Sequence, residues 1–243
     1  MPPPLASLLA ASVLWACAAQ AEPLAVTPLS RDLPWWQARH VAKLTEARGG
    51  ADVVLLGDSI TQQWERTEYA AVWQRYFGAR RALDLGFDGD ATSHLLWRIE
   101  HGELAGLRPR AAVILIGANN LGRLHWAAAD DVAGIVAVVE QTRQRLPDTP
   151  ILLLGVLPSD RGPWVAAQAR AINTALGQRY TGGQGVRFAD PSPLFLLPDG
   201  RVATALYRDR PPDPALHPSP EGMARLAGWM EPVLARWLGD QPR

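Results

Sequence analysis

Three apolar runs without polar alternation constrain the fold of this chain most strongly. They occupy residues 53–56, 113–116 and 151–156, and valine, isoleucine and leucine dominate them. Runs of this kind are typical of strands buried on both faces, as in a parallel sheet that helices cover on either side. Residues 186–188 form a shorter strand candidate. The pattern therefore favours a parallel sheet with two helical layers.

Apolar residues recur at helical spacing between and after these runs. The helical patterns span residues 132–146, 165–180 and 223–237, and Pro232 lies inside the last of them, where it should kink or split the helix. Alternating strands and helices predict an α/β fold, a three-layer α/β/α sandwich. A chain of 243 residues is long enough for one such domain and too short for two. We expect it at residues 51–240, after an N-terminal extension at residues 22–50.

Residues 1–21 resemble a secretory signal peptide. Their apolar stretch, residues 5–19, is too short to span a bilayer, and Ala19-Gln20-Ala21 forms a cleavage site with small residues at both ends. We therefore expect a periplasmic or secreted protein, cleaved after Ala21, with no stable membrane span. A lipid-modified Cys17 is the alternative, although Trp15 fits a lipobox poorly. Cys17 is the single cysteine, so its removal would exclude disulfides and thiolate chemistry.

Composition and motifs exclude several other functions. Lysine plus arginine and aspartate plus glutamate both number 24, so the formal net charge is zero. No basic stripe indicates a nucleic-acid partner. No cluster of histidine and carboxylate residues has the spacing of a metal site, and no glycine fingerprint for a nucleotide occurs. We therefore expect no cofactor and no metal, and the sequence leaves the oligomeric state open.

A serine follows the first strand-like run, where the chain turns into a helical stretch. Ser59 comes directly after Gly57 and Asp58. At the end of a parallel strand its hydroxyl would face the sheet edge where open α/β folds bind ligands, which suits a nucleophile. The position also suits a helix-capping serine. Thr61 replaces the second glycine of a G-x-S-x-G turn, and this argues against an ordinary α/β-hydrolase elbow.

Three further residues should lie near this serine. Gly89 follows a short strand-like run at residues 81–84, Asn119 follows the run at residues 113–116, and His217 precedes the last helical pattern. The carboxyl ends of parallel strands meet at one edge, so a hydroxyl, a glycine amide and a carboxamide would come together there. Ester hydrolysis needs this set of groups, with a histidine to move the proton.

These blocks resemble those of the SGNH/GDSL hydrolase family. Residues 86–98 and 102–104 are most similar to the branch that contains the catalytic subunits of platelet-activating-factor acetylhydrolase, and the resemblance runs from residue 52 to the C-terminal helix. It implies a flavodoxin-like fold with a five-stranded parallel sheet. It also implies a nucleophilic Ser59, a basic His217, and an oxyanion hole.

The resemblance assigns the oxyanion hole to the backbone N–H groups of Ser59 and Gly89 and to the side chain of Asn119. It gives the neighbouring Asn120 a structural role in the same loop. Asp58 is interpreted as the residue that holds the loop around the nucleophile.

The catalytic acid is the point where this sequence departs from the family pattern. The family spacing D-x-x-H places the acid at residue 214, which is Pro214. Asp213 lies one residue earlier, and a loop can absorb one inserted residue, so we expect Asp213 to be the acid. Asp209 is the next alternative, and His217 acting without a carboxylate is a third.

The sequence therefore favours an exported serine esterase that hydrolyses short-chain esters, acetyl esters first, of a small substrate such as an acetylated glycan or a lipid ester. A lysophospholipase- or thioesterase-type acyl hydrolase is an alternative, because specificity lies in the loops. A glycan-binding module with decayed catalysis is another, supported only by the displaced Asp213. Trp64, Trp126 or Trp164 could line the substrate pocket.

Overall fold

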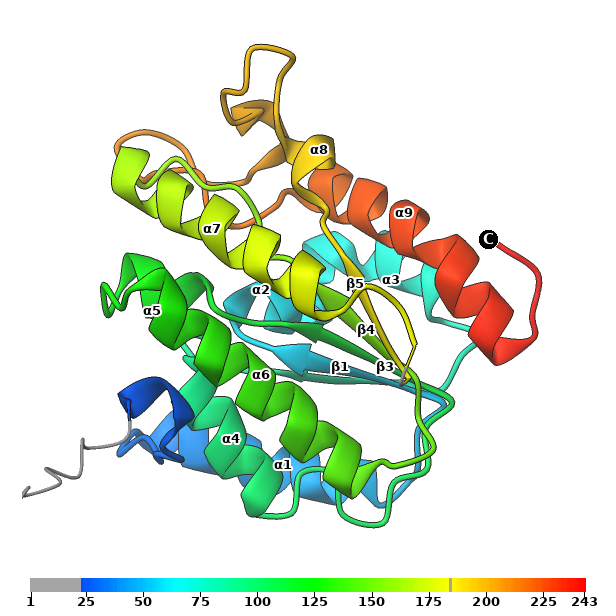
Figure 1. The fold of residues 1–243 in the computed structure, drawn as a ribbon. Coiled ribbons are helices and arrows are strands. Elements are labelled where there is room, and N and C mark those ends of the chain that lie inside the picture. The colour runs from blue at the N-terminus through cyan, green and yellow to red at the C-terminus, as the bar shows by residue number, and fades with distance from the viewer. Residues whose placement is uncertain (1–22, 184) are drawn as a thin grey trace, which may run out of the picture.

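Five parallel strands form the centre of the structure, a computed structural model that describes residues 23–183 and 185–243. The expected signal peptide, its cleavage site and Cys17 lie outside the described residues. The strands follow the order β2-β1-β3-β4-β5, which is the flavodoxin-like order (Figure 1). The strands are β1 (Val53–Gly57), β2 (Ala82–Gly86), β3 (Ala111–Leu115), β4 (Ile151–Leu154) and β5 (Val186–Ala189). The predicted α/β class and five-stranded parallel sheet are therefore confirmed.

Successive side chains of the strands enter two separate cores. In β1, Val54 and Leu56 join one apolar cluster, whereas Val53 and Leu55 join the other. All five residues of β1 are buried. This burial on both faces explains why the strand shows no polar alternation in the sequence.

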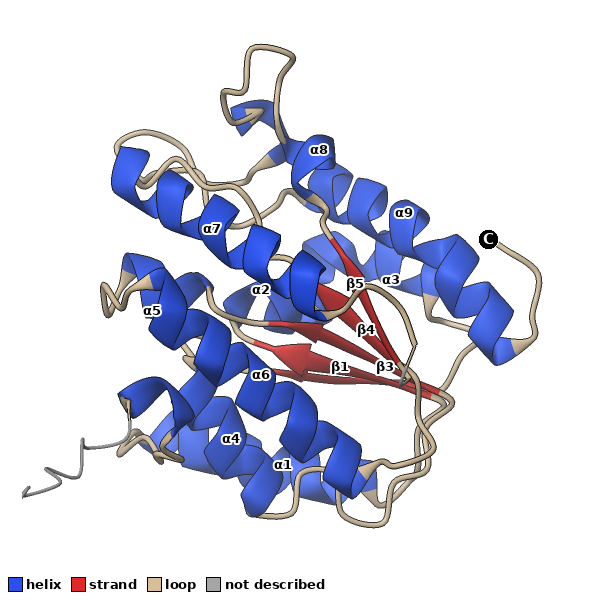
Figure 2. Ribbon diagram, in the orientation of Figure 1, coloured by secondary structure: helices blue, strands red, loops and turns tan. Residues whose placement is uncertain are grey.

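Helices cover both faces of the sheet, as Figure 2 shows. The first apolar cluster takes its helical side chains mainly from α4, α6 and α7, and the second takes them mainly from α3 and α9. The α-helices are α1 (Pro34–Ala47), α2 (Ser59–Gln62), α3 (Ala70–Tyr76), α4 (Thr92–Glu100), α5 (Ala118–Gly122), α6 (Ala128–Arg145), α7 (Pro163–Arg179), α8 (Ser192–Phe195) and α9 (Pro220–Leu238).

Short 3-10 helices complete the framework. The 3-10 segments are η1 (Leu24–Val26), η2 (Gln63–Glu65), η3 (Thr67–Tyr69) and η4 (Thr204–Leu206).

Pro232 does not split α9, which continues on both sides of it. Met230 and Leu234, on either side of the proline, are both buried in the core, so packing holds the two halves together.

The N-terminal extension packs against the domain. Trp36 of α1 is fully buried, and its indole N–H donates a hydrogen bond to Asp90 Oδ1 at 2.7 Å. The carbonyl oxygen of Ala25 accepts a hydrogen bond from the Thr92 hydroxyl at 2.8 Å. Both partners belong to the segment that follows β2, so the extension stabilises a loop that borders the carboxyl edge of the sheet.

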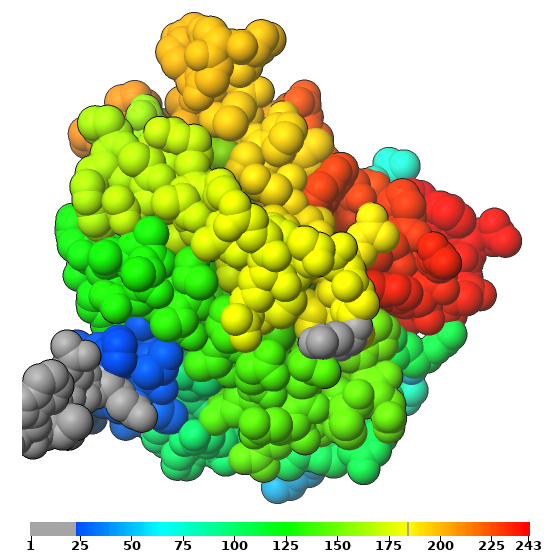
Figure 3. All heavy atoms as spheres, viewed as in Figure 1, coloured from blue at the N-terminus to red at the C-terminus, as the bar shows by residue number. Residues whose placement is uncertain are grey.

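The segment between β5 and α9 contains little regular structure. It includes only α8 and η4, and the part that follows α8 protrudes from the surface (Figure 3). His217 lies at its end. Within residues 23–183 and 185–243, no helix combines the length and apolar character needed to cross a bilayer.

Asp84 of β2 makes stability depend on pH. Its side chain is buried, Oδ1 accepts the Gly86 N–H at 2.7 Å, and Oδ2 has no partner among the described residues. Burial, with a contribution from Glu65, raises the pKa of Asp84 to about 8. The folded state then holds a proton that the unfolded chain releases at a lower pH. The stability that this proton provides is complete below about pH 4 and is lost as the pH rises to about 8.

We therefore expect Asp84→Asn to raise the melting temperature by several degrees at about pH 8.5 and to change it little at about pH 4. An amide keeps the acceptor for Gly86 and carries no charge that must be buried. Thermal unfolding of both proteins across this pH range measures the effect. An equal shift at both pH values would contradict the assignment to this carboxyl group.

Candidate active site

Ser59 begins α2 directly after β1, at the carboxyl edge of the sheet. A side chain at Gly57 would not fit, because a Cβ there would lie 2.1 Å from the Thr61 hydroxyl and 2.4 Å from the Leu115 carbonyl oxygen. Asp58 caps the short helix by accepting the Ile60 N–H at 2.9 Å. Burial raises the pKa of Asp58 to about 7. Asp58 thus holds the loop, which leaves the Ser59 hydroxyl free of a capping role.

A chain of hydrogen bonds joins a serine, a histidine and an aspartate. Ser59 Oγ lies 3.0 Å from His217 Nε2, and His217 Nδ1 lies 3.1 Å from Asp209 Oδ1. An ionised carboxylate can only accept, so Nδ1 carries the proton of the neutral ring and Nε2 is left to accept from the serine. This is the arrangement in which a histidine can remove a hydroxyl proton.

The carboxylate that contacts His217 belongs to Asp209, so the expected contact with Asp213 is corrected. Among the described residues, the Asp213 side chain makes no hydrogen bond, and its backbone N–H donates to Arg210 within the turn. An antiparallel bridge between Tyr207 and Pro218 explains the difference. It folds the loop back on itself and brings Asp209, eight residues before the histidine, beside the imidazole.

Asp209 is held in its ionised form. One carboxylate oxygen, Oδ2, accepts the backbone N–H groups of Leu216 at 2.8 Å and His217 at 2.6 Å. Burial opposes ionisation, but these two N–H groups and the His217 ring keep the pKa of Asp209 below its ordinary value. The carboxylate therefore stays charged where it can orient the imidazole.

The histidine loop is tied to the serine by hydrogen bonds to Pro218. The Pro218 carbonyl oxygen accepts one hydrogen bond from Gln63 Nε2 at 3.1 Å and another from the Tyr69 hydroxyl at 2.8 Å. Gln63 belongs to η2, which follows the serine helix directly. The spacing between Ser59 and His217 therefore depends on buried side chains rather than on a free loop.

The two donors expected beside the serine lie in neighbouring loops. Asn119 is 9% exposed, and its Nδ2 donates one hydrogen to the Asp90 carbonyl oxygen at 3.0 Å. A carboxamide has a second N–H, which no described residue accepts. Gly89 has a φ of +72°, which favours glycine, and no described residue accepts its backbone N–H. Both groups are thus available as donors.

A buried ionic network holds the loop that carries Gly89. Arg98 is fully buried, with Nε 2.9 Å from Asp90 Oδ2 and with Nη1 bonded to Glu103. The same guanidinium donates to the carbonyl oxygens of Leu85 and Gly57, each at 3.1 Å. It therefore joins the ends of β1 and β2.

Asn120 acts as the structural amide of its loop. Its Nδ2 donates to the Thr92 hydroxyl and to Asp131 Oδ1, each at 2.9 Å, and its Oδ1 accepts the Thr92 N–H at 3.1 Å. These bonds connect the end of β3 with the starts of α4 and α6, and they fix the backbone next to Asn119.

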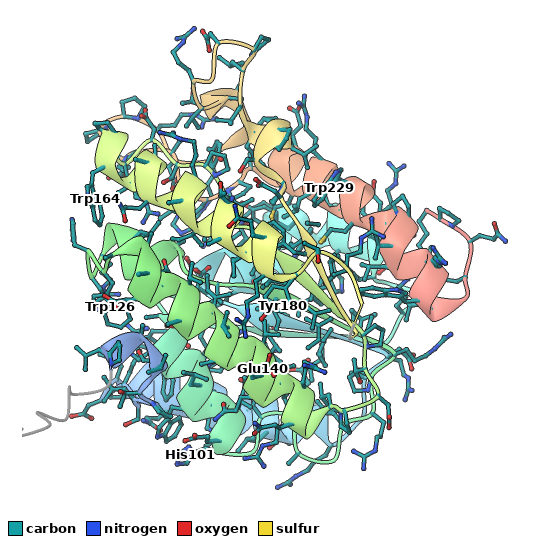
Figure 4. The ribbon with its side chains drawn as sticks, in the orientation of Figure 1. His101, Trp126, Glu140, Trp164, Tyr180 and Trp229 are labelled. Carbon is teal, nitrogen blue, oxygen red and sulfur yellow. The ribbon has the colours of Figure 1, made fainter. Side chains whose placement is uncertain are left out.

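A cavity of about 180 Å³ opens at the serine and histidine. Its lining consists of Ser59, Gln62, Gln63, Arg66, Asp88, Arg208 and His217. The two arginines cannot be recognised from the sequence as site residues, because an isolated arginine in a loop carries no motif. None of the tryptophans considered above lines this cavity. Trp64 is buried against Phe77, whereas Trp126 and Trp164 lie at another part of the carboxyl edge (Figure 4).

No group of three or more histidine, cysteine, aspartate or glutamate residues in the described part of the chain could hold a metal ion. The groups gathered at Ser59 are a hydroxyl, an imidazole, a carboxylate and N–H donors. They are suited to acyl transfer through a covalent serine ester.

The chain matches a known enzyme family over most of its length. The model of the GDSL-like lipase/acylhydrolase family matches residues 55–225, most of the chain and all of the site. The chain belongs to this family of ester hydrolases. The platelet-activating factor acetylhydrolase IB subunit alpha1 of Bos taurus is 31% identical over 183 residues, which are 75% of this chain and 76% of that protein.

Solved structures share the fold at lower identity. A GDSL-like lipase from Bacteroides thetaiotaomicron superimposes with a TM-score of 0.64 and 17% identity, over 82% of this chain and 98% of the other. An acetyl-xylooligosaccharide esterase from Geobacillus gives a TM-score of 0.58 and 19% identity, over 80% and 98% of the two chains. These two similarities concern the fold.

Proposed function

We propose that this family member is a serine esterase that transfers a short acyl group, acetyl in the first place, from an ester to water. One observation carries the proposal: the hydrogen-bonded chain from Ser59 through His217 to Asp209. The order of its groups is that of a nucleophile, a base and a residue that orients the base.

In the proposed reaction Ser59 Oγ attacks the ester carbonyl carbon while His217 Nε2 takes the hydroxyl proton. The N–H groups of Ser59 and Gly89 and the Asn119 carboxamide donate to the oxyanion that forms. When the tetrahedral intermediate collapses, His217 returns the proton to the leaving alcohol, and Ser59 keeps the acyl group. Water, deprotonated by the same imidazole, then releases the acid and restores the serine. Asp209 holds the ring and stabilises its charged form.

The proposal also includes a preference for acetyl groups and export of the protein. Each of these two parts has its own support. The acetylhydrolase and acetyl-xylooligosaccharide esterase among the similar proteins favour a small acyl group. Export to the periplasm or the medium rests on the pattern of residues 1–21 alone. The alternative of a decayed binding module loses its sequence support, because Asp209 supplies the contact with His217 that was expected of Asp213.

Hydrolysis of p-nitrophenyl esters with acyl chains from acetyl to palmitoyl tests the acyl preference. We expect kcat/KM to be highest for acetyl and to fall with each added pair of carbons. Measurements below the micelle concentration of the longer esters provide the control. A maximum at long chains would replace the acetyl proposal with a lipase- or lysophospholipase-type activity.

A further inference from the structure

The position of His217 defines the alcohol side of the site. A leaving oxygen must come within hydrogen-bond distance of Nε2 to receive the proton. The cavity of about 180 Å³ is lined by both Ser59 and His217, so on the proposed function the alcohol part of the ester occupies it. Residues on the other walls of this cavity therefore contact the alcohol.

Arg208 is the unusual residue on these walls. Its guanidinium makes no hydrogen bond and has no carboxylate within 4.0 Å among the described residues, and its Nε is shielded from solvent. The backbone beside it is fixed, because the Arg208 N–H donates to the His217 carbonyl oxygen at 2.9 Å. A positive group is thus held next to the catalytic histidine with its hydrogen-bonding capacity unused.

The other charges at the cavity do not neutralise this group. Arg66 is half exposed, and its Nε already binds Glu68 at 2.7 Å. Asp88 is exposed and belongs to the lining, but it forms no ion pair with Arg208. A guanidinium presents several N–H donors in a plane, which matches the oxygens of a carboxylate or a phosphate.

We propose that Arg208 is a specificity-determining residue that binds an anionic group, a carboxylate or a phosphate, on the alcohol part of the ester. The inference rests on the proposed esterase function and narrows its substrates to esters of negatively charged alcohols. Charge-assisted hydrogen bonds of this kind raise binding by about tenfold to a hundredfold.

The test compares small acetyl esters whose alcohol parts carry different charges. The neutral reference is 2-acetoxyethanol, the phosphate probe is 2-acetoxyethyl phosphate, the carboxylate probe is 3-acetoxypropionate, and acetylcholine carries the opposite charge. We expect kcat/KM for one or both anions to exceed that of the neutral ester by about tenfold or more, and acetylcholine to fall below it. The phosphate and carboxylate arms distinguish the two anion classes.

The ratio of anionic to neutral kcat/KM is the decisive quantity, because a general defect of the site cancels in it. Arg208→Gln should reduce this ratio to about one or less, and Arg208→Lys should give a ratio between that of Arg208→Gln and that of the wild type. Added salt should lower the ratio in the wild type. Arg143→Gln, a change at a partly exposed arginine in the last turn of α6, is the matched control and should leave the ratio intact.

Three results distinguish a failure of the Arg208 role from a failure of the esterase function on which it rests. Serine-dependent hydrolysis of 2-acetoxyethanol without an anion preference, or with a preference that survives Arg208→Gln, would overturn the role of Arg208 alone. A higher kcat/KM for acetylcholine than for the neutral ester would indicate that Asp88, rather than Arg208, selects the alcohol part of the substrate. No hydrolysis of any of the four esters would count against the esterase itself.

Discussion

Replacing Ser59 with alanine should remove the hydrolysis of p-nitrophenyl acetate almost completely, with a loss in kcat of roughly a million-fold, as for other serine nucleophiles. The hydroxyl is the group that would attack the carbonyl carbon, and His217 lies 3.0 Å from it. The fold should survive, because Asp58, rather than Ser59, caps α2. Initial rates with purified protein, together with the melting temperature, measure both effects.

Ser192→Ala provides a matched control for the nucleophile. Ser192 starts α8, and its hydroxyl bonds the Asn173 side chain rather than a histidine. This variant should keep its esterase activity. Full activity in Ser59→Ala with a normal melting temperature would show that another group is the nucleophile.

Asp209→Asn should lower kcat by about ten-thousand-fold, as the loss of an orienting carboxylate does in serine hydrolases. The asparagine oxygen can still accept the N–H groups of Leu216 and His217, where Oδ2 now accepts them. Its NH₂ group would then face Nδ1. A donor there favours the tautomer with the proton on Nε2, which cannot accept the serine proton.

Asp213→Asn is the control that separates the two acids, and it should be nearly silent. Asp213 lies in the same loop and carries the same charge, but its side chain makes no hydrogen bond to His217 among the described residues. The rates of both variants at one pH, with their melting temperatures, decide between them. A large loss of kcat in Asp213→Asn would show that Asp213 is the acid, as the sequence spacing predicts. Near-normal activity in both variants would show that Ser59 and His217 act without a carboxylate.

The sequence predicts the fold and most of the site because the relevant signals are local. An unbroken apolar run such as residues 53–56 indicates a strand buried on both faces wherever it occurs. Ser59 and Asn119 follow such runs directly. Parallel topology then brings them to one edge, so their proximity follows from the order of the elements.

The acid could not be predicted in this way because its contact with His217 is not local. It depends on the bridge between Tyr207 and Pro218, which forms inside a segment with little regular structure. Spacing alone favoured Asp213. Arg208 has no sequence signal for the same reason, since only the folded loop places its guanidinium at the cavity, where no described residue pairs with it.

Covalent labelling with a fluorophosphonate tests the central claim most directly. The reagent reacts with a serine only when a neighbouring base activates it and donors stabilise the negative oxygen. Mass spectrometry of the intact protein and of its peptides should find one adduct, located on Ser59. The adduct should disappear in Ser59→Ala and be strongly reduced in Asp209→Asn. An unlabelled Ser59 in a folded protein, or an adduct on a different residue that accounts for the activity, would contradict the account.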